Sequence, residues 1–148
     1  MKKIHAQILI ICCIICIFSV NAFSHCEIPC GIYDDEMRIE MINEHIVTIE
    51  KSMNQIMHLQ MDGLQNSNQL IRWIMNKEDH ADEIQEIISQ YFMTQRITPD
   101  MKDYGKKLGL LHEMLISAMK CKQTTDLTHV GKLRDFVKEF QRLYFEKE

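Results

Sequence analysis

One histidine and two cysteines lie within six positions near the start of the chain. The stretch reads His25-Cys26-Glu-Ile-Pro29-Cys30, and no other part of the sequence combines a histidine with two cysteines over so few positions. Imidazole nitrogen and thiolate sulfur are ligands that transition metals accept, and nitrogen and sulfur donors arranged in a plane suit nickel or copper. The segment is therefore a candidate metal site.

Three other interpretations of this stretch are a structural zinc site, a c-type haem and a disulfide loop, and only the last of them remains open. A structural zinc site needs four nitrogen or sulfur ligands, usually in two spaced pairs, and the sequence has no second pair. A c-type haem is excluded because no C-x-x-C-H motif is present. A small disulfide loop between Cys26 and Cys30 is reasonable outside the cytosol. The choice is thus between a metal site and a disulfide loop.

The first 24 residues have the pattern of a secretory signal peptide. Lys2 and Lys3 precede an apolar run at residues 8–20, and small residues follow at Ala22 and Ser24. A membrane anchor is the competing interpretation, but the run is shorter than the roughly 20 apolar residues that a spanning helix needs. Cleavage after Ser24 would start the mature chain at His25, with a free α-amine as a further metal donor.

Cleavage also changes the cysteine count and the charge. Cys12, Cys13 and Cys16 would be removed, leaving Cys26, Cys30 and Cys121. An odd number does not fit a disulfide framework. Losing two lysines makes the mature chain two units more negative than the −4 of the full sequence. An acidic chain with no basic stripe argues against nucleic acid and anionic membranes as partners.

From Asp34 onward the apolar residues recur at helical spacing. The pattern predicts helices over residues 34–59, 68–93 and 100–122, and a fourth that starts between 125 and 128. The residues expected on the apolar faces include Ile39, Ile42, Ile46, Ile49, Met53, Leu70, Ile71, Ile74, Met75, Ala81, Ile84, Ile88, Tyr91, Phe92, Leu111, Met119, Leu133, Val137 and Phe140. Four helices joined by short loops predict an all-α fold, an antiparallel four-helix bundle.

The remaining histidines and Cys121 suggest no second site. A di-iron carboxylate centre in a bundle uses Glu-x-x-His pairs, and none of the helical histidines has a glutamate three positions earlier. We interpret them as polar residues without a ligand role, and Cys121 as a buried, unreactive thiol.

The pattern His25-Cys26-x-x-Pro29-Cys30-Gly31-x-Tyr33 resembles the nickel hook of the nickel-containing superoxide dismutases. In that family the mature chain starts at the histidine and continues as a four-helix bundle, so the resemblance covers residues 25–148. It implies three parts: a targeting peptide at residues 1–24 that is cleaved, a nickel hook at residues 25–33, and a bundle at residues 34–148.

The resemblance also implies roles for individual residues. His25 would bind nickel through its α-amine and, axially, its imidazole; Cys26 would bind through its thiolate and backbone amide, and Cys30 through its thiolate. Tyr33 would order water and substrate over the open axial face. Glu40 would orient the imidazole of His25.

Gly31 would let the chain leave the hook close to the metal. A second active-site tyrosine of the family would correspond to Tyr91, although the spacing to Tyr91 in this chain is about four residues shorter than the family's. His80 takes the place of an arginine that usually helps to hold the axial imidazole.

The implied activity is disproportionation of superoxide to O2 and H2O2, with one nickel per subunit cycling between Ni2+ and Ni3+ in a homohexamer. The targeting peptide implies export to the periplasm or the extracellular space, with no membrane association after cleavage; a cytoplasmic form with dedicated processing is the alternative. Two other functions stay open: an exported nickel or copper carrier without turnover, and a disulfide-bonded helical interaction module.

Overall fold

The computed structural model describes His5, residues 31–61 and residues 63–146. The chain divides into two compact units, Met1–Cys30 and Gly31–Glu148. Only His5 of the first unit is described, so the fold below is that of the second unit. Among the described helices, none is both long enough and apolar enough to cross a membrane.

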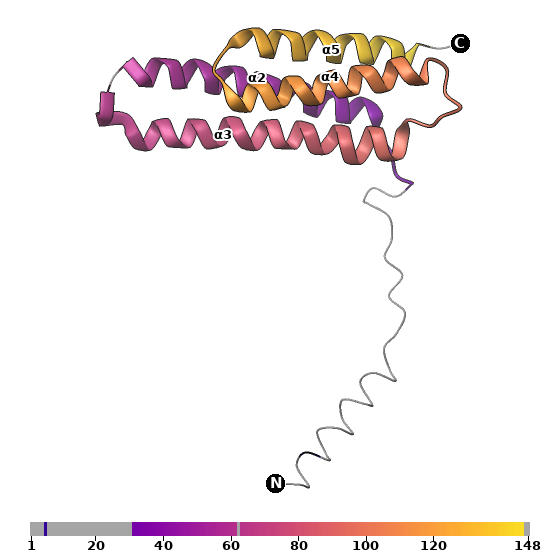
Figure 1. Cartoon of the computed structure of the whole chain (residues 1–148), viewed down its shortest axis with the longest axis horizontal. Coiled ribbons are helices and arrows are strands. Elements are labelled where there is room, and N and C mark those ends of the chain that lie inside the picture. The colour runs from indigo at the N-terminus through magenta and orange to yellow at the C-terminus, as the bar shows by residue number, and fades with distance from the viewer. Residues whose placement is uncertain (1–4, 6–30, 62, 147–148) are drawn as a thin grey trace. The chain divides into compact units, whose positions relative to one another are not determined.

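Four antiparallel helices make up the second unit (Figure 1). They are α2 (Asp35–Met61), α3 (Ser67–Glu86), α4 (Tyr104–Gln123) and α5 (Leu127–Phe145). A short 3-10 turn, η1 (Gly63–Asn66), joins α2 to α3, and a π-helical segment, η2 (Ile87–Arg96), continues α3. The described residues contain no strand. The predicted all-α four-helix bundle is therefore confirmed.

Side-chain caps mark the starts of two helices, α2 and α5. The Asp34 carboxylate accepts a hydrogen bond of 3.0 Å from the Met37 amide, and the acidic Asp35 and Glu36 follow in the first turn of α2. Asp126 caps α5 in the same way, accepting a 2.9 Å bond from the Thr128 amide. The α2 cap lies next to Asp35, the first residue of that helix.

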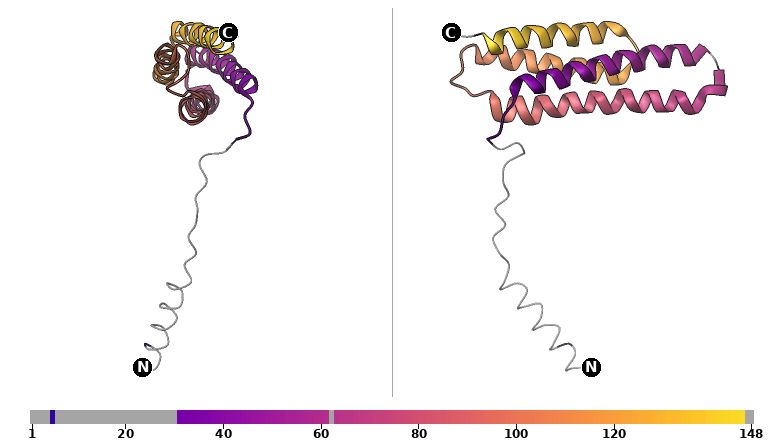
Figure 2. Two further views of the ribbon diagram at one scale, coloured as in Figure 1. Left: turned by 90° about the vertical axis from the view of Figure 1, so that its right-hand side faces the viewer. Right: turned by 180° about the vertical axis from the view of Figure 1, so that it is seen from behind.

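The core lies along the axis that the four helices enclose, and the end-on view of Figure 2 shows them around it. α2 packs on α3 and α5, and α4 packs on α3 and α5. The largest fully buried side chains are Phe92, Phe140, Ile39, Ile42, Ile46, Ile49, Met53, Ile56, Ile84, Ile88, Leu111 and Met114. Most of the predicted apolar faces thus form the core.

The prediction was wrong for part of α3. Ile71, Ile74 and Met75 are 57%, 38% and 58% exposed, and Met119 on α4 is 37% exposed. The physical reason on α3 is visible in Figure 1: the α2–α3 hairpin extends past the corner between α4 and α5, so the first turns of α3 have no helix from that pair to cover them. Helical spacing alone does not reveal which stripe lacks a partner.

Two helix ends also differ from the prediction. The second helix continues to Arg96 rather than to residue 93, because its last ten residues form the π-helix η2. It ends at Ile97, which is extended, two residues before Pro99. The third helix begins at Tyr104 rather than near residue 100. The loop between them is therefore shifted but of short length, as expected for antiparallel neighbours.

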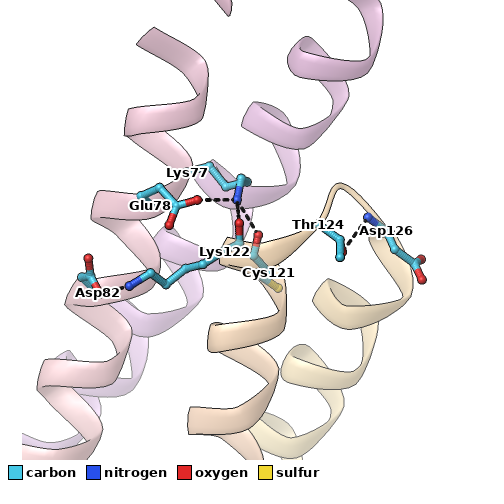
Figure 3. A network of polar contacts seen from close by, with 7 residues as sticks. All are labelled: Lys77, Glu78, Asp82, Cys121, Lys122, Thr124 and Asp126. Carbon is cyan, nitrogen blue, oxygen red and sulfur yellow. Dashed lines mark hydrogen bonds and ion pairs between the residues drawn. The ribbon is translucent and has the colours of Figure 1, made fainter. Parts of the chain in front are cut away.

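A buried lysine holds α3 against the end of α4 (Figure 3). The Lys77 side chain is 3% exposed, and its ammonium donates to the carbonyl oxygens of Cys121 and Lys122 and, at 2.8 Å, to the Glu78 carboxylate. The last carbonyls of a helix have no intrahelical partner and carry partial negative charge. Lys77 therefore caps α4 from a neighbouring helix.

Replacing this lysine tests the cap. Lys77→Met keeps a long, unbranched side chain but leaves two carbonyls and a carboxylate without their donor. We therefore expect the free energy of unfolding to fall by about 1–3 kcal/mol. Urea unfolding followed by circular dichroism measures it. Lys120→Met, at an exposed position in the same turn of α4, is the control and should change little. Equal losses in the two variants would contradict the capping role.

Candidate functional site

The predicted nickel ligands His25, Cys26 and Cys30 lie outside the described residues. Gly31 follows Cys30 directly and is the first residue of the described range 31–61, and its φ is +81°. L-residues with a side chain rarely adopt this left-handed conformation. A Cβ added at Gly31 would meet no atom within 4 Å, so the glycine is needed for its backbone angle rather than for space. Gly31 therefore has a backbone conformation that favours glycine.

Tyr33 and Tyr91 lie together, although 58 positions separate them in the sequence. Their ring centroids are 5.9 Å apart and the rings meet edge to face, an arrangement that aromatic pairs favour. Tyr33 is 39% exposed, while Tyr91 is only 3% exposed. The structure thus combines a tyrosine at the surface with one in the core.

A single carboxylate, Asp35, organises this tyrosine pair. It accepts hydrogen bonds from the hydroxyls of Tyr91 (2.6 Å) and Tyr144 (2.8 Å). It also accepts two from the Arg96 guanidinium, from Nε at 2.8 Å and Nη2 at 2.7 Å. The guanidinium in turn lies over the Tyr33 ring, with its central carbon 4.3 Å from the ring centroid. We call Tyr33, Asp35, Tyr91, Arg96 and Tyr144 the Asp35 cluster.

The π-helix η2 explains how Tyr91 and Arg96 reach the same carboxylate. Residues five apart in an α-helix point about 140° away from each other. In η2 the side-chain bonds from Thr94 to the Ser89 carbonyl (2.6 Å) and from Gln95 to the Gln90 carbonyl (2.9 Å) also span five residues. The wider turn therefore brings residues at i and i+5 to the same side. Single π turns are often found at functional sites.

The charges of the cluster are set by these contacts. Burial acts to raise the pKa of Asp35, but the hydrogen bonds from Arg96, Tyr91 and Tyr144 outweigh it, and the net pKa is below the ordinary value. Burial and the bond to Asp35 raise the pKa of Tyr144 to about 12 and raise the pKa of Tyr91 as well. At neutral pH Asp35 is thus ionised, and both buried phenols keep their protons.

A second arginine, Arg38, faces the pair from α2. Its guanidinium carbon lies 5.0 Å from the centroid of the Tyr91 ring, within the range of a cation–π contact. Its Nε is buried without a hydrogen-bond partner, and its Nη1 reaches the Met41 sulfur at 3.9 Å. Arg38 therefore places a positive charge against Tyr91 that no described carboxylate neutralises at close range.

Glu40, the other predicted site residue that the structure describes, lies on a different face of α2. It lines a groove against α5 together with Lys138, Gln141 and Arg142. Two residues along an α-helix turn the side chain by about 200°, so Glu40 points away from the side on which Arg38 meets Tyr91. The structure therefore brings Tyr33 and Tyr91 together but does not bring Glu40 to them.

His80 forms a pair with His45 across α2 and α3. Their Nδ1 atoms are 2.7 Å apart and the ring centroids are 4.9 Å apart. At this distance one nitrogen donates a proton and the other accepts it. The sequence predicted polar residues without a ligand role at the helical histidines, and the structure adds that these two are hydrogen-bonded to each other. The pair was not apparent because the two positions are 35 residues apart.

The bundle itself offers no alternative metal site. No group of three or more His, Cys, Asp or Glu side chains that could hold a metal is present among residues 31–61 and 63–146. Cys121 is free and fully buried, and burial raises the pKa of its thiol to about 11. The prediction of a buried thiol is confirmed. The thiolate and imidazole donors that suit nickel are those of His25, Cys26 and Cys30.

A helical bundle preceded by such a donor segment defines a class of small helical metalloproteins. The chain belongs to the nickel-containing superoxide dismutase family, whose sequence model matches residues 20–148. Among curated proteins it is 24% identical to the superoxide dismutase [Ni] of Streptomyces seoulensis, over 86% of this chain and 90% of that protein. No solved structure matches the chain significantly.

The histidine pair predicts a pH effect on stability. Burial and the charge of His80 lower the pKa of His45, although Glu83 and Glu44 act in the opposite sense. Below the ordinary pKa of 6.5 the unfolded chain therefore binds a proton more readily than the folded one. We expect the free energy of unfolding to fall as pH decreases from about 7.5 to about 5.5, measured by urea unfolding. His45→Gln should lose part of this dependence, whereas the exposed control His112→Gln should keep it. The same pH dependence in both variants would contradict the assignment.

Proposed function

We propose that this chain is a nickel superoxide dismutase that converts two superoxide ions and two protons into O2 and H2O2. The observation that carries the proposal is the donor motif His25-Cys26-x-x-Pro29-Cys30-Gly31-x-Tyr33. It lies within residues 20–148, which the sequence model of the family matches. The ligands are the α-amine and imidazole of His25, the thiolate and amide of Cys26, and the thiolate of Cys30. One nickel is bound per subunit.

When bound, nickel supplies a one-electron couple between Ni2+ and Ni3+. The residues of the chain make this couple accessible, because thiolates and an anionic amide donate more electron density than water does. Tyr33, partly exposed and the last residue of the hook, orders water and the substrate. Tyr91 has its hydroxyl bonded to Asp35 and contributes its ring to the wall beside Tyr33. Glu40, exposed on α2, orients the ring of His25.

Export is the second part of the proposal. Residues 1–24 direct the chain to the periplasm or the extracellular space, and their removal frees the α-amine of His25. The order of the positive end, the apolar run and the small residues before His25 supports this. Processing would then also be activation, since the amine is a ligand only after cleavage.

Assembly into a homohexamer is the third part. Ile71, Ile74 and Met75 form an exposed apolar stripe on α3, where the α2–α3 hairpin extends past the other two helices (Figure 1). Contiguous exposed apolar surface often marks a contact between proteins. Copies of the chain that cover this stripe would account for it, which agrees with the hexamer that the resemblance implies.

The ligand assignment is tested with cysteine variants of the chain that starts at His25. Cys26→Ser and Cys30→Ser should abolish catalysed superoxide decay, because a hydroxyl is a hard and poorly donating ligand for nickel. Cys121→Ser is the matched control and should keep nickel content and activity nearly unchanged. Pulse radiolysis and metal analysis measure both. Loss of activity in the control with retention in the other two would overturn the assignment, and nickel binding without any turnover would favour a carrier.

The role of the N-terminus is tested by one added residue. An alanine before His25 turns its α-amine into a peptide nitrogen, which carries a proton that must leave before it can bind a metal. We expect this extended chain, loaded with Ni2+, to lose nearly all activity and to lack the Ni3+ paramagnetic resonance signal of the chain that starts at His25. Equal activity and equal spectra would rule out the α-amine as a ligand.

A further inference from the structure

We propose that Asp35 and Arg96 form a clamp that fixes the Tyr33–Tyr91 ring pair, and that they are positioning residues for the superoxide reaction. The inference rests on the proposed function only for its catalytic part. The clamp itself is a statement about contacts among the described residues.

The first step is that few of the described residues hold the Tyr33 ring in place. It precedes α2 in a segment, residues 31–34, whose members are all exposed. Among residues 31–61 and 63–146, its ring contacts are the Arg96 guanidinium at 4.3 Å and the edge-to-face contact with Tyr91 at 5.9 Å. Both contacts come from η2, so the position of the Tyr33 ring depends on that segment.

The second step is that both supports of Tyr33 depend on one carboxylate. Asp35 accepts the Tyr91 hydroxyl at 2.6 Å and two bonds from Arg96 at 2.8 and 2.7 Å. Asp35 is also only two residues from Tyr33 in the sequence. These contacts form a closed cycle, which we call the loop. The backbone joins Tyr33 to Asp35, Asp35 accepts bonds from Arg96, and Arg96 lies over the Tyr33 ring.

The third step is that the loop is rigid. The Asp35 side chain is 15% exposed and that of Arg96 27%, so solvent competes only partly for their bonds. An Arg–carboxylate pair with two parallel bonds fixes orientation as well as distance. Tyr144 on α5 adds a fourth bond to Asp35 at 2.8 Å. Removal of either Asp35 or Arg96 opens the loop and releases Tyr33.

Consequences for the reaction follow from position. If Tyr33 orders water and substrate beside the hook, a shift of its ring by about 1 Å changes the approach of the substrate, and misplacements of this size can cost up to about 100-fold in rate. The clamp residues touch neither substrate nor metal in this scheme. They act through the two tyrosine rings.

The test compares Asp35→Asn and Arg96→Gln with Arg134→Gln, all in the nickel-loaded chain that starts at His25. Arg134→Gln is the matched control, because it removes an Arg–carboxylate pair to Glu50 at 2.8 Å, with side chains 33% and 39% exposed, without touching a tyrosine. Two clamp variants are used so that a folding defect in one leaves the other. Tyrosine rings labelled with 13C are followed by NMR, with Tyr33→Phe to assign the Tyr33 signals.

We expect the Tyr33 ring signals, displaced by the neighbouring Tyr91 ring, to move to the positions of free tyrosine in both clamp variants and to stay in the control. Superoxide decay per bound nickel should fall about tenfold or more in the clamp variants, with unchanged nickel content. Unmoved Tyr33 signals would refute the clamp, and moved signals with control-level activity would refute its positioning role. An inactive unmutated chain would instead refute the proposed function, while the ring signals would still decide the clamp.

Discussion

The carboxylate of Asp35 joins three parts of the bundle at one end. Its own helix is α2, and its four hydrogen bonds come from Tyr91 and Arg96 on η2 and from Tyr144 on α5. A partly buried charge loses hydration, and only well-placed donors offset that loss. Here the offset is sufficient to keep the pKa of Asp35 below its ordinary value despite burial. Such a group contributes less to stability than to uniqueness, because only one arrangement of the three elements satisfies all four bonds.

That arrangement in turn depends on η2. If residues 87–96 continued as a regular α-helix, Tyr91 and Arg96 would point in directions about 140° apart, and Asp35 could not accept bonds from both. The π-helix has a cost, since wide turns pack their backbone less well and are rare. The bonds to Asp35 offset this cost. Tyr91, whose spacing is about four residues shorter than the resemblance implies for the second tyrosine, thus reaches the pair within a segment whose helical phase is altered.

Much of the fold could be predicted because it is encoded locally. Apolar residues at helical spacing and acidic residues at the start of α2 were sufficient for the four helices, and the short loops made the antiparallel order natural. Spacing could not show which apolar residues lack a partner, so Ile71 and Met75 were expected in the core and lie at the surface. The period of α3 also gave no sign of η2, because a change of helix type is decided by tertiary contacts.

The candidate site likewise has one part that local sequence predicts and one part that depends on long-range contacts. Its donor segment and Tyr33 are contiguous in the sequence, so the pattern of residue types and the requirement for a glycine at Gly31 could be read directly. The Asp35 cluster depends on contacts between residues 56, 61 and 109 positions apart, and the His45–His80 pair on contacts 35 apart. No local pattern marks Asp35, Arg96 or Tyr144 as belonging together.

This division has a consequence for how such a site can change. A donor segment at a chain end needs few long-range contacts to keep its ligands, so it can persist while the rest of the chain diverges, and this chain is 24% identical to its Streptomyces relative. The tyrosine pair is a different matter, because each ring is placed by a bundle whose helix lengths and phases can vary. A change in helix length or phase must then be absorbed near the tyrosines. In this chain η2 and the Asp35 cluster are where the described structure departs from regular α-helix packing, and they lie at the tyrosine pair.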